Sequence, residues 1–160
     1  METNSIQNRE QQITCSNLEM NNKGMTQKQI FLVQQTWKIF RKIRPEIIGD
    51  VFYSKLFVEM PALEKLFVNP LSNQYKKLID MISLVVGRLH NFDEITNDIR
   101  ELAKRHVGYG VKPAHYKLVG EALLWTLQQG LGKDWNEEVK EAWEQCYKIM
   151  SDTMIEAAKS

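Results

Sequence analysis

The chain has 160 residues, of which 43% are apolar and 26% charged, enough for one domain with a buried core. Its net charge of +1, with basic residues spread along the chain, gives no support for a nucleic-acid partner. None of its apolar runs approaches the length of about 20 residues that a membrane-spanning helix needs, and no signal-peptide pattern is present. Cys15 and Cys146 have neither disulfide-framework nor metal-ligand spacing, so we expect a cytoplasmic protein.

The chain begins with a polar stretch. Residues 1–24 are rich in Asn, Gln, Glu and Ser, and their apolar residues are too scattered to make a face. They predict a mobile N-terminal extension. After it, Thr26 predicts the N-cap of an amphipathic helix that lasts to about Arg44. Pro45 ends that helix and opens a second, whose period continues through residues 47–56.

Short helices follow in the middle of the chain. Pro61 opens a single turn of helix, and Ser72 predicts the N-cap of a longer helix that fades near His90. Asp93 predicts the cap of a short helix ending at His106, after which two glycines terminate it.

Two long helices complete the chain, the first from Pro113 to about Leu131 and the second opened by Asn136. No segment alternates like a strand, so the sequence predicts an all-α domain of about seven or eight helices. Because two helices are short and break at proline or glycine, a simple four-helix bundle is excluded.

His106 shares an apolar helix face with Ile99, Leu102 and Ala103, so its imidazole is expected to point inward. A buried imidazole needs a partner for each nitrogen. Either a metal or ordinary hydrogen bonds would satisfy it, and the spacing alone leaves both open.

Three stretches together resemble the globin family. Residues 52–67 look like the end of a globin B helix, the C helix and the phenylalanine that packs on haem. Residues 102–106, Leu-Ala-Lys-Arg-His, look like the F helix with its proximal histidine. Residues 107–121, Val-Gly-Tyr-Gly-Val-Lys-Pro-Ala-His-Tyr-Lys-Leu-Val-Gly-Glu, resemble the FG corner and G helix of bacterial single-domain haemoglobins and flavohaemoglobin haem domains, and neuroglobin-like globins share part of that run.

The resemblance implies a globin domain over residues 25–160, folded as a three-over-three helical sandwich that holds haem b (iron protoporphyrin IX) between its E and F helices. His106 is then the axial ligand of iron. Tyr53 and Gln74 fall at the distal positions, where a phenol and an amide N–H can each stabilise a bound diatomic ligand by about 1–2 kcal/mol. The alternatives are a packed core tyrosine and a solvent-facing glutamine. No distal histidine is present, so a pentacoordinate iron is expected.

The remaining implied roles are less specific to residue type. Lys77 is placed to pair with a haem propionate, with a solvated lysine as the alternative. Tyr116 matches a tyrosine that hydrogen-bonds near the proximal histidine. In flavohaemoglobins a glutamate completes this proximal group. Ala158 occupies the matching position here, with Glu156 nearby, and this departure puts peroxidase-like chemistry in doubt. The expected apolar wall around haem consists of Phe67, Leu78, Leu102, Val111 and Val119.

The resemblance implies a haem protein that reversibly binds dioxygen, carbon monoxide and nitric oxide, as an oxygen carrier does. One alternative is nitric oxide dioxygenation. Since the chain has no Gly-x-Gly-x-x-Gly stretch and little room for a reductase domain, turnover would need a separate reductase. A haem-based gas sensor and a haem-free interaction module are further alternatives. The joint presence of His106, Tyr53, Gln74 and Phe67 argues against the last.

Overall fold

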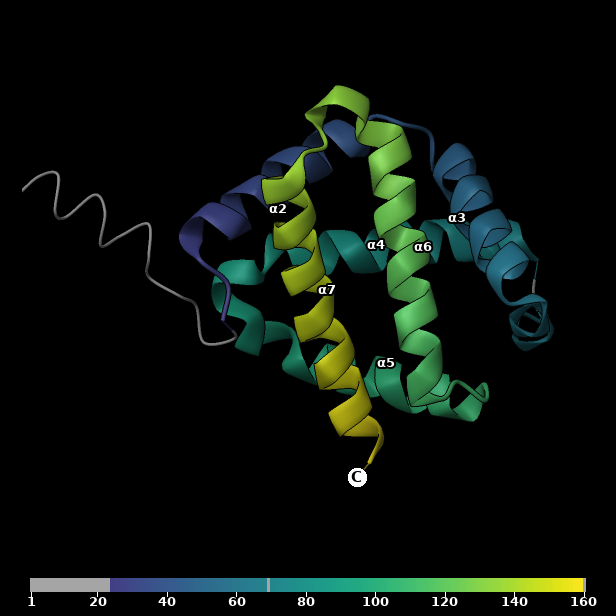
Figure 1. Cartoon of the computed structure of the whole chain (residues 1–160). Coiled ribbons are helices and arrows are strands. Elements are labelled where there is room, and N and C mark those ends of the chain that lie inside the picture. The colour runs from purple at the N-terminus through teal and green to yellow at the C-terminus, as the bar shows by residue number, and fades with distance from the viewer. Residues whose placement is uncertain (1–23, 69, 160) are drawn as a thin grey trace, which may run out of the picture.

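The computed structural model describes residues 24–68 and 70–159, and the elements they form are all helices (Figure 1). Apart from Gly24, the predicted extension of residues 1–24 lies outside the described residues. No helix in the described ranges is long and apolar enough to cross a membrane. In chain order the elements are α2 (Gln27–Phe40), α3 (Pro45–Glu59), the 3-10 helix η1 (Pro61–Leu66), α4 (Leu71–Gly87), the 3-10 helix η2 (Leu89–Ile95), α5 (Thr96–Gly108), α6 (Pro113–Leu131), the 3-10 helix η3 (Gly132–Asp134) and α7 (Glu137–Ala158).

Most predicted helix starts are confirmed. The Thr26 side chain accepts a hydrogen bond from the third residue of α2, and Asn136 does the same for α7. Pro45, Pro61 and Pro113 each lie in the first turn of their helices, where the missing N–H costs nothing.

Several predicted boundaries are wrong, among them the ends of α4, at Gly87 and not near His90, and of α5, at Gly108 and not at His106. The first helix ends at Phe40, four residues early. Helix α4 starts before the predicted cap Ser72, because Pro70 at φ −53° already holds the chain in a helix-entry geometry. Asp93 lies inside η2 and is not the N-cap of α5, which is Ile95, and Asn91 at φ −133° and ψ 56° kinks η2.

Part of the core lies where α2 contacts α7 and α4. Trp143 is 1% exposed, and its indole N–H donates to Thr36 Oγ1 at 2.9 Å. The indole N–H of Trp37 donates to Ser83 Oγ at 3.1 Å. These bonds tie α2 to α7 and to α4, and they satisfy the two indoles that the core buries.

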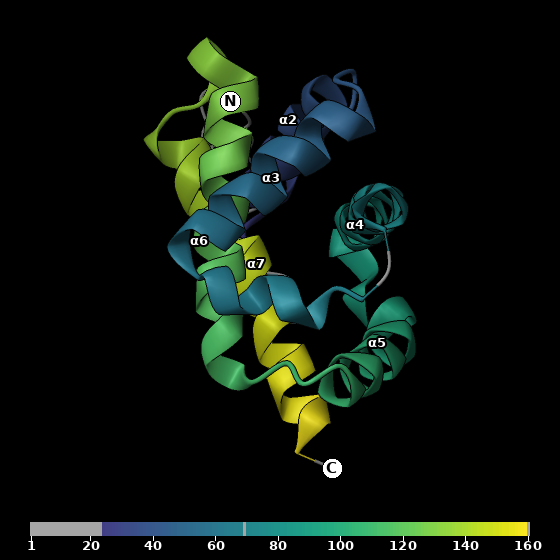
Figure 2. The same ribbon diagram turned by 90° about the vertical axis from the view of Figure 1, so that its right-hand side faces the viewer.

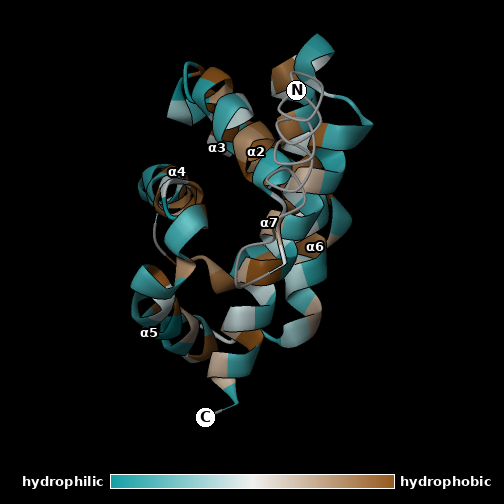
Figure 3. Ribbon diagram, turned by 90° about the vertical axis from the view of Figure 1, so that its left-hand side faces the viewer, coloured by the Kyte–Doolittle hydropathy of each residue, from teal (hydrophilic) through white to brown (hydrophobic). Residues whose placement is uncertain are grey.

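Helices α4 and α5 are held apart by their neighbours. Helix α5 packs mainly on α7, while α3 packs on both α4 and α6. Contact between α4 and α5 themselves is at most marginal. Figure 2 shows them on one side of the molecule with a separation between them, and α6 and α7 on the other side. Figure 3 shows the same separation from the opposite direction, with hydrophilic residues on their outward sides.

Candidate functional site

The imidazole of His106 has one nitrogen in use and one free. Its Nδ1 lies 2.8 Å from the carbonyl oxygen of Leu102, one turn earlier on α5. A carbonyl can only accept, so Nδ1 carries the proton, and the neutral ring then has its lone pair on Nε2. Nε2 has no hydrogen-bond partner within the described residues, where every buried polar side-chain atom has one. Nε2 therefore faces accessible space and is available as a ligand.

The surroundings of His106 keep it neutral. Burial lowers the pKa of the imidazole, with a smaller contribution from the nearby Arg105 charge, while the Leu102 carbonyl acts in the opposite sense. A neutral imidazole is the form that binds metals. The described residues contain no group of three His, Cys, Asp or Glu side chains able to hold an ion. A metal bound at His106 would therefore need further ligands besides these side chains, and a macrocycle such as haem is one group that supplies them.

Tyr53 lies on α3 inside a group of aromatic rings. It is 5% exposed, and its ring centroid lies 5.3 Å from Phe67 in an edge-on contact and 5.9 Å from Phe57. A third ring, Tyr75 of α4, stacks on it at 5.6 Å and 27°. The Tyr53 hydroxyl bonds to no protein atom within the described ranges, and yet it is not among buried unsatisfied atoms. It must therefore reach open space beside the rings, where a ligand can accept a hydrogen bond from it.

Burial raises the pKa of Tyr53 to about 12, and the proximity of Tyr75 adds to this effect. At neutral pH the side chain is consequently a phenol that can donate a hydrogen bond. The same burial opposes the phenolate that direct coordination of a metal would require.

The other predicted distal residues lie on α4. Gln74 is half-buried, and its amide makes no hydrogen bond to another described residue. Leu78, one turn later, is half-buried and packs on the core. Lys77 is exposed and takes part in none of the ion pairs that the described residues form. Both of its predicted roles, pairing with a haem propionate and simple solvation, are consistent with this position.

Three residues of the predicted apolar wall lie on α5, on α6 and in the connection between them. Leu102, Val111 and Val119 are all half-buried. Tyr116 offers its backbone carbonyl to the hydroxyl of Tyr147 in a short hydrogen bond. Within the described residues the Tyr116 hydroxyl makes no hydrogen bond to His106.

The end of α7 provides no acceptor for His106. Glu156 is exposed and pairs with Lys159 at 3.4 Å, and Ala158 has no polar side chain. The carbonyl of Leu102 is therefore what orients the imidazole. This arrangement agrees with the sequence departure at residue 158.

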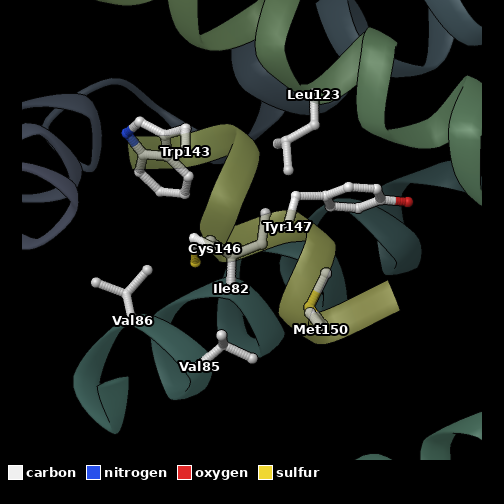
Figure 4. Close-up of a pocket in the computed structure, with 8 residues that line it drawn as sticks. All are labelled: Ile82, Val85, Val86, Leu123, Trp143, Cys146, Tyr147 and Met150. Atoms are coloured by element: carbon white, nitrogen blue, oxygen red, sulfur yellow. The ribbon is translucent and has the colours of Figure 1, made fainter. Parts of the chain in front are cut away.

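A small apolar cavity of about 10 Å³ lies between α4, α6 and α7, large enough for a water-sized molecule (Figure 4). Leu78 and Val119 lie one helical turn from its lining residues Ile82 and Leu123, so the cavity continues the predicted apolar wall inward. Its full lining is Ile82, Val85, Val86, Leu123, Trp143, Cys146, Tyr147 and Met150.

The buried thiol in this lining predicts a loss of stability in alkali. Complete burial raises the pKa of Cys146 from 9.0 to about 12, so the unfolded chain releases this proton first. The contribution of this thiol to the free energy of unfolding should be constant well below pH 9 and fall by up to about 1.4 kcal/mol per pH unit between pH 9 and 10. Urea unfolding at half-unit steps measures this slope. Cys146→Ala should remove it, and an equal slope in that variant would contradict the assignment.

Two contacts of the site have no signal in the sequence. Tyr75 completes the ring group around Tyr53, and the glycine that makes room for it is Gly49 of α3. Tyr147 likewise packs on Gly120, where an added Cβ would lie 2.4 Å from its ring. Hydrophobic periodicity places residues on a face of one helix, but it does not pair a glycine of one helix with an aromatic ring of another.

Comparisons with known proteins identify the family and the fold of the chain. A family model described as Globin matches residues 50–154. An uncharacterized globin-like protein of Aquifex aeolicus is 31% identical over 135 residues, covering 84% of this chain and 95% of that protein. A flavohemoprotein of Oceanobacillus iheyensis is 27% identical over 144 residues, covering 84% of this chain but only 36% of the flavohemoprotein.

Among solved structures, a bacterial globin from Campylobacter jejuni has a TM-score of 0.73 and 25% identity, covering 84% of this chain and 96% of that one. The predicted all-α globin fold is thus confirmed. The family implies a haem cofactor, iron binding and diatomic gas ligands, while the individual pocket residues stay predictions. On the family match and the Aquifex relative, the chain belongs to the globin family.

Proposed function

We propose that the chain holds haem b and reversibly binds dioxygen, with carbon monoxide and nitric oxide as further ligands, using His106 as the proximal ligand and Tyr53 with Gln74 on the distal side. The observation that carries the proposal is the hydrogen bonding of the His106 imidazole. Its Nδ1 is committed to the Leu102 carbonyl, so Nε2 carries the lone pair and is accessible.

When bound, haem would supply an iron that His106 holds and at which a diatomic gas can bind. The chain's own residues would supply orientation and polarity. The Leu102 carbonyl holds the imidazole plane, and the neutral Tyr53 phenol offers one hydrogen bond to a polar ligand. Gln74 offers a second donor from α4, and the aromatic rings around Tyr53 limit the access of water to it.

The absorption spectrum of the purified full chain tests the proposal. After reconstitution with haem we expect a Soret band, a pentacoordinate ferrous spectrum and a reversible change on adding and removing dioxygen. A chain that stays colourless would overturn the proposal. A ferrous spectrum already hexacoordinate without added ligand would overturn the open distal site but leave haem binding in place.

The resemblance to flavohaemoglobin haem domains, with a flavohemoprotein among the relatives, supports one second candidate, nitric oxide dioxygenation, in which nitric oxide, dioxygen and one electron give nitrate. This chain spans about a third of that relative's length, and the test below supplies the electron from a generic reductase. Nitrate formation with a generic reductase, compared between the wild type and Tyr53→Phe, distinguishes the two candidates. Stoichiometric nitrate without turnover would indicate a carrier.

A further inference from the structure

Tyr75 occupies a slot that exists only because residue 49 is glycine. The Tyr75 ring lies directly on the α3 backbone, and a Cβ added at Gly49 would lie 2.2 Å from both Cγ and Cδ1 of that ring. No side chain larger than hydrogen fits there without displacing Tyr75. The close approach of α3 and α4 at this point therefore depends on the glycine and the tyrosine together.

From this slot Tyr75 reaches Tyr53. The two rings stack with centroids 5.6 Å apart and planes inclined by 27°. Phe52 and Phe67 contact Tyr53 edge-on, at 4.9 Å and 5.3 Å. With Phe57, whose ring centroid lies 5.9 Å away, four rings restrict the rotamer of Tyr53, and Tyr75 makes the stacked contact.

Neither phenol uses its oxygen to hold this arrangement. The described residues offer no hydrogen bond to the hydroxyl of Tyr53 or of Tyr75, although each is close enough to the other for an electrostatic effect. The contact that constrains Tyr53 is therefore made by the face of the Tyr75 ring. Phenylalanine at residue 75 would keep that face, whereas leucine would not.

We propose that Tyr75, seated against Gly49, is a positioning residue that fixes the direction of the Tyr53 hydroxyl in the distal pocket. The inference rests on the proposed function, because it assumes that Tyr53 faces the bound gas. It adds a residue on α4 that neither helical periodicity nor the family resemblance assigns.

The test uses the haem-loaded full chain in five forms: wild type, Tyr53→Phe, Tyr75→Phe, Tyr75→Leu and the double variant Tyr53→Phe/Tyr75→Leu. Two quantities are measured, the dioxygen dissociation rate and the infrared stretching band of bound carbon monoxide, which reports the polarity next to the ligand. Tyr75→Phe should keep the wild-type band and a rate within about twofold. Tyr75→Leu should broaden or split the band and quicken dissociation by about three- to tenfold, as the hydroxyl loses its fixed direction.

The double variant separates positioning from general loosening. Once the Tyr53 hydroxyl is gone, Tyr75→Leu should add less than about a twofold change, because nothing remains to be misdirected. Equal, independent effects of the two substitutions would overturn the inference. So would a Tyr75→Leu variant that melts at a lower temperature but keeps the wild-type band and rate, since that outcome is purely structural.

A second route leaves both tyrosines in place. Gly49→Ala should expel the Tyr75 ring and reproduce the band change of Tyr75→Leu. Gly87→Ala in α4 is the matched control, because a Cβ there meets nothing within 4 Å, and it should leave the band unchanged. An unaltered band in Gly49→Ala would contradict the inference while haem binding stands, whereas a wild type that binds no haem would overturn the proposed function and the inference with it.

Discussion

Replacing His106 by alanine is expected to abolish stable haem binding, weakening it by more than about 100-fold. Loss of a group that merely orients a ligand costs about 10- to 100-fold in metal affinity, and loss of the ligand itself should cost more. The measurement is the Soret absorbance after reconstitution, followed by the rate of haem loss to an excess of acceptor protein.

Two controls separate a ligand from a structural histidine. His90→Ala removes an exposed histidine of η2 and should leave the spectrum unchanged. His106→Gly should recover a Soret band when free imidazole is added, because the small molecule can replace the missing ring. Retention of the wild-type spectrum in His106→Ala would show that Nε2 is not the ligand.

The helices of this chain could be predicted wherever a local cause acts alone. Thr26 and Asn136 bond the first turns of their own helices, and proline at the start of α3, η1 and α6 has a fixed φ. The predictions failed where a neighbour overrides a good capping residue. Ser72 is a favourable N-cap, but Pro70 starts the helix first. Asp93 is another, but it lies within a kinked 3-10 segment whose ends are held by buried Leu89 and Ile95.

In the candidate site, too, contacts within one helix could be predicted from the sequence, whereas contacts between helices could not. The hydrogen bond from His106 to Leu102 joins residues one turn apart, so helical spacing already contains it. The contact between Tyr75 and Gly49 joins two helices, and it depends on how closely they cross. A single sequence carries no signal for such a crossing, and the resemblance assigned roles only to positions that match the family pattern. The contacts of Tyr75 with Gly49 and Tyr53 therefore follow only from the three-dimensional arrangement of α3 and α4.

Replacing Tyr53 by phenylalanine should quicken dioxygen dissociation by about tenfold, the effect of losing one hydrogen bond of about 1.4 kcal/mol. The carbon monoxide rate should change much less, because that ligand is less polar. Stability should stay within about 0.5 kcal/mol, since the hydroxyl has no partner among the described residues to be left unpaired, and the ring contacts with Phe67 and Tyr75 remain. Stopped-flow mixing with carbon monoxide measures the dissociation rate, and urea unfolding measures the stability.

The combination of a large kinetic change with unchanged stability is what makes this substitution informative. A tyrosine kept only for packing would lose nothing in either measurement, since phenylalanine preserves its buried surface. Tyr109→Phe removes a hydroxyl from a side chain that is 58% exposed beyond the end of α5, and it serves as the matched control with no expected effect. If Tyr53→Phe also leaves dioxygen dissociation unchanged, its phenol does not face the ligand. Gln74→Leu would then be the next variant, because Gln74 is the remaining predicted donor on the distal side. A tenfold change in Tyr53→Phe alone would instead explain why the chain keeps a phenol, at 5% exposure, with no protein partner for its hydroxyl.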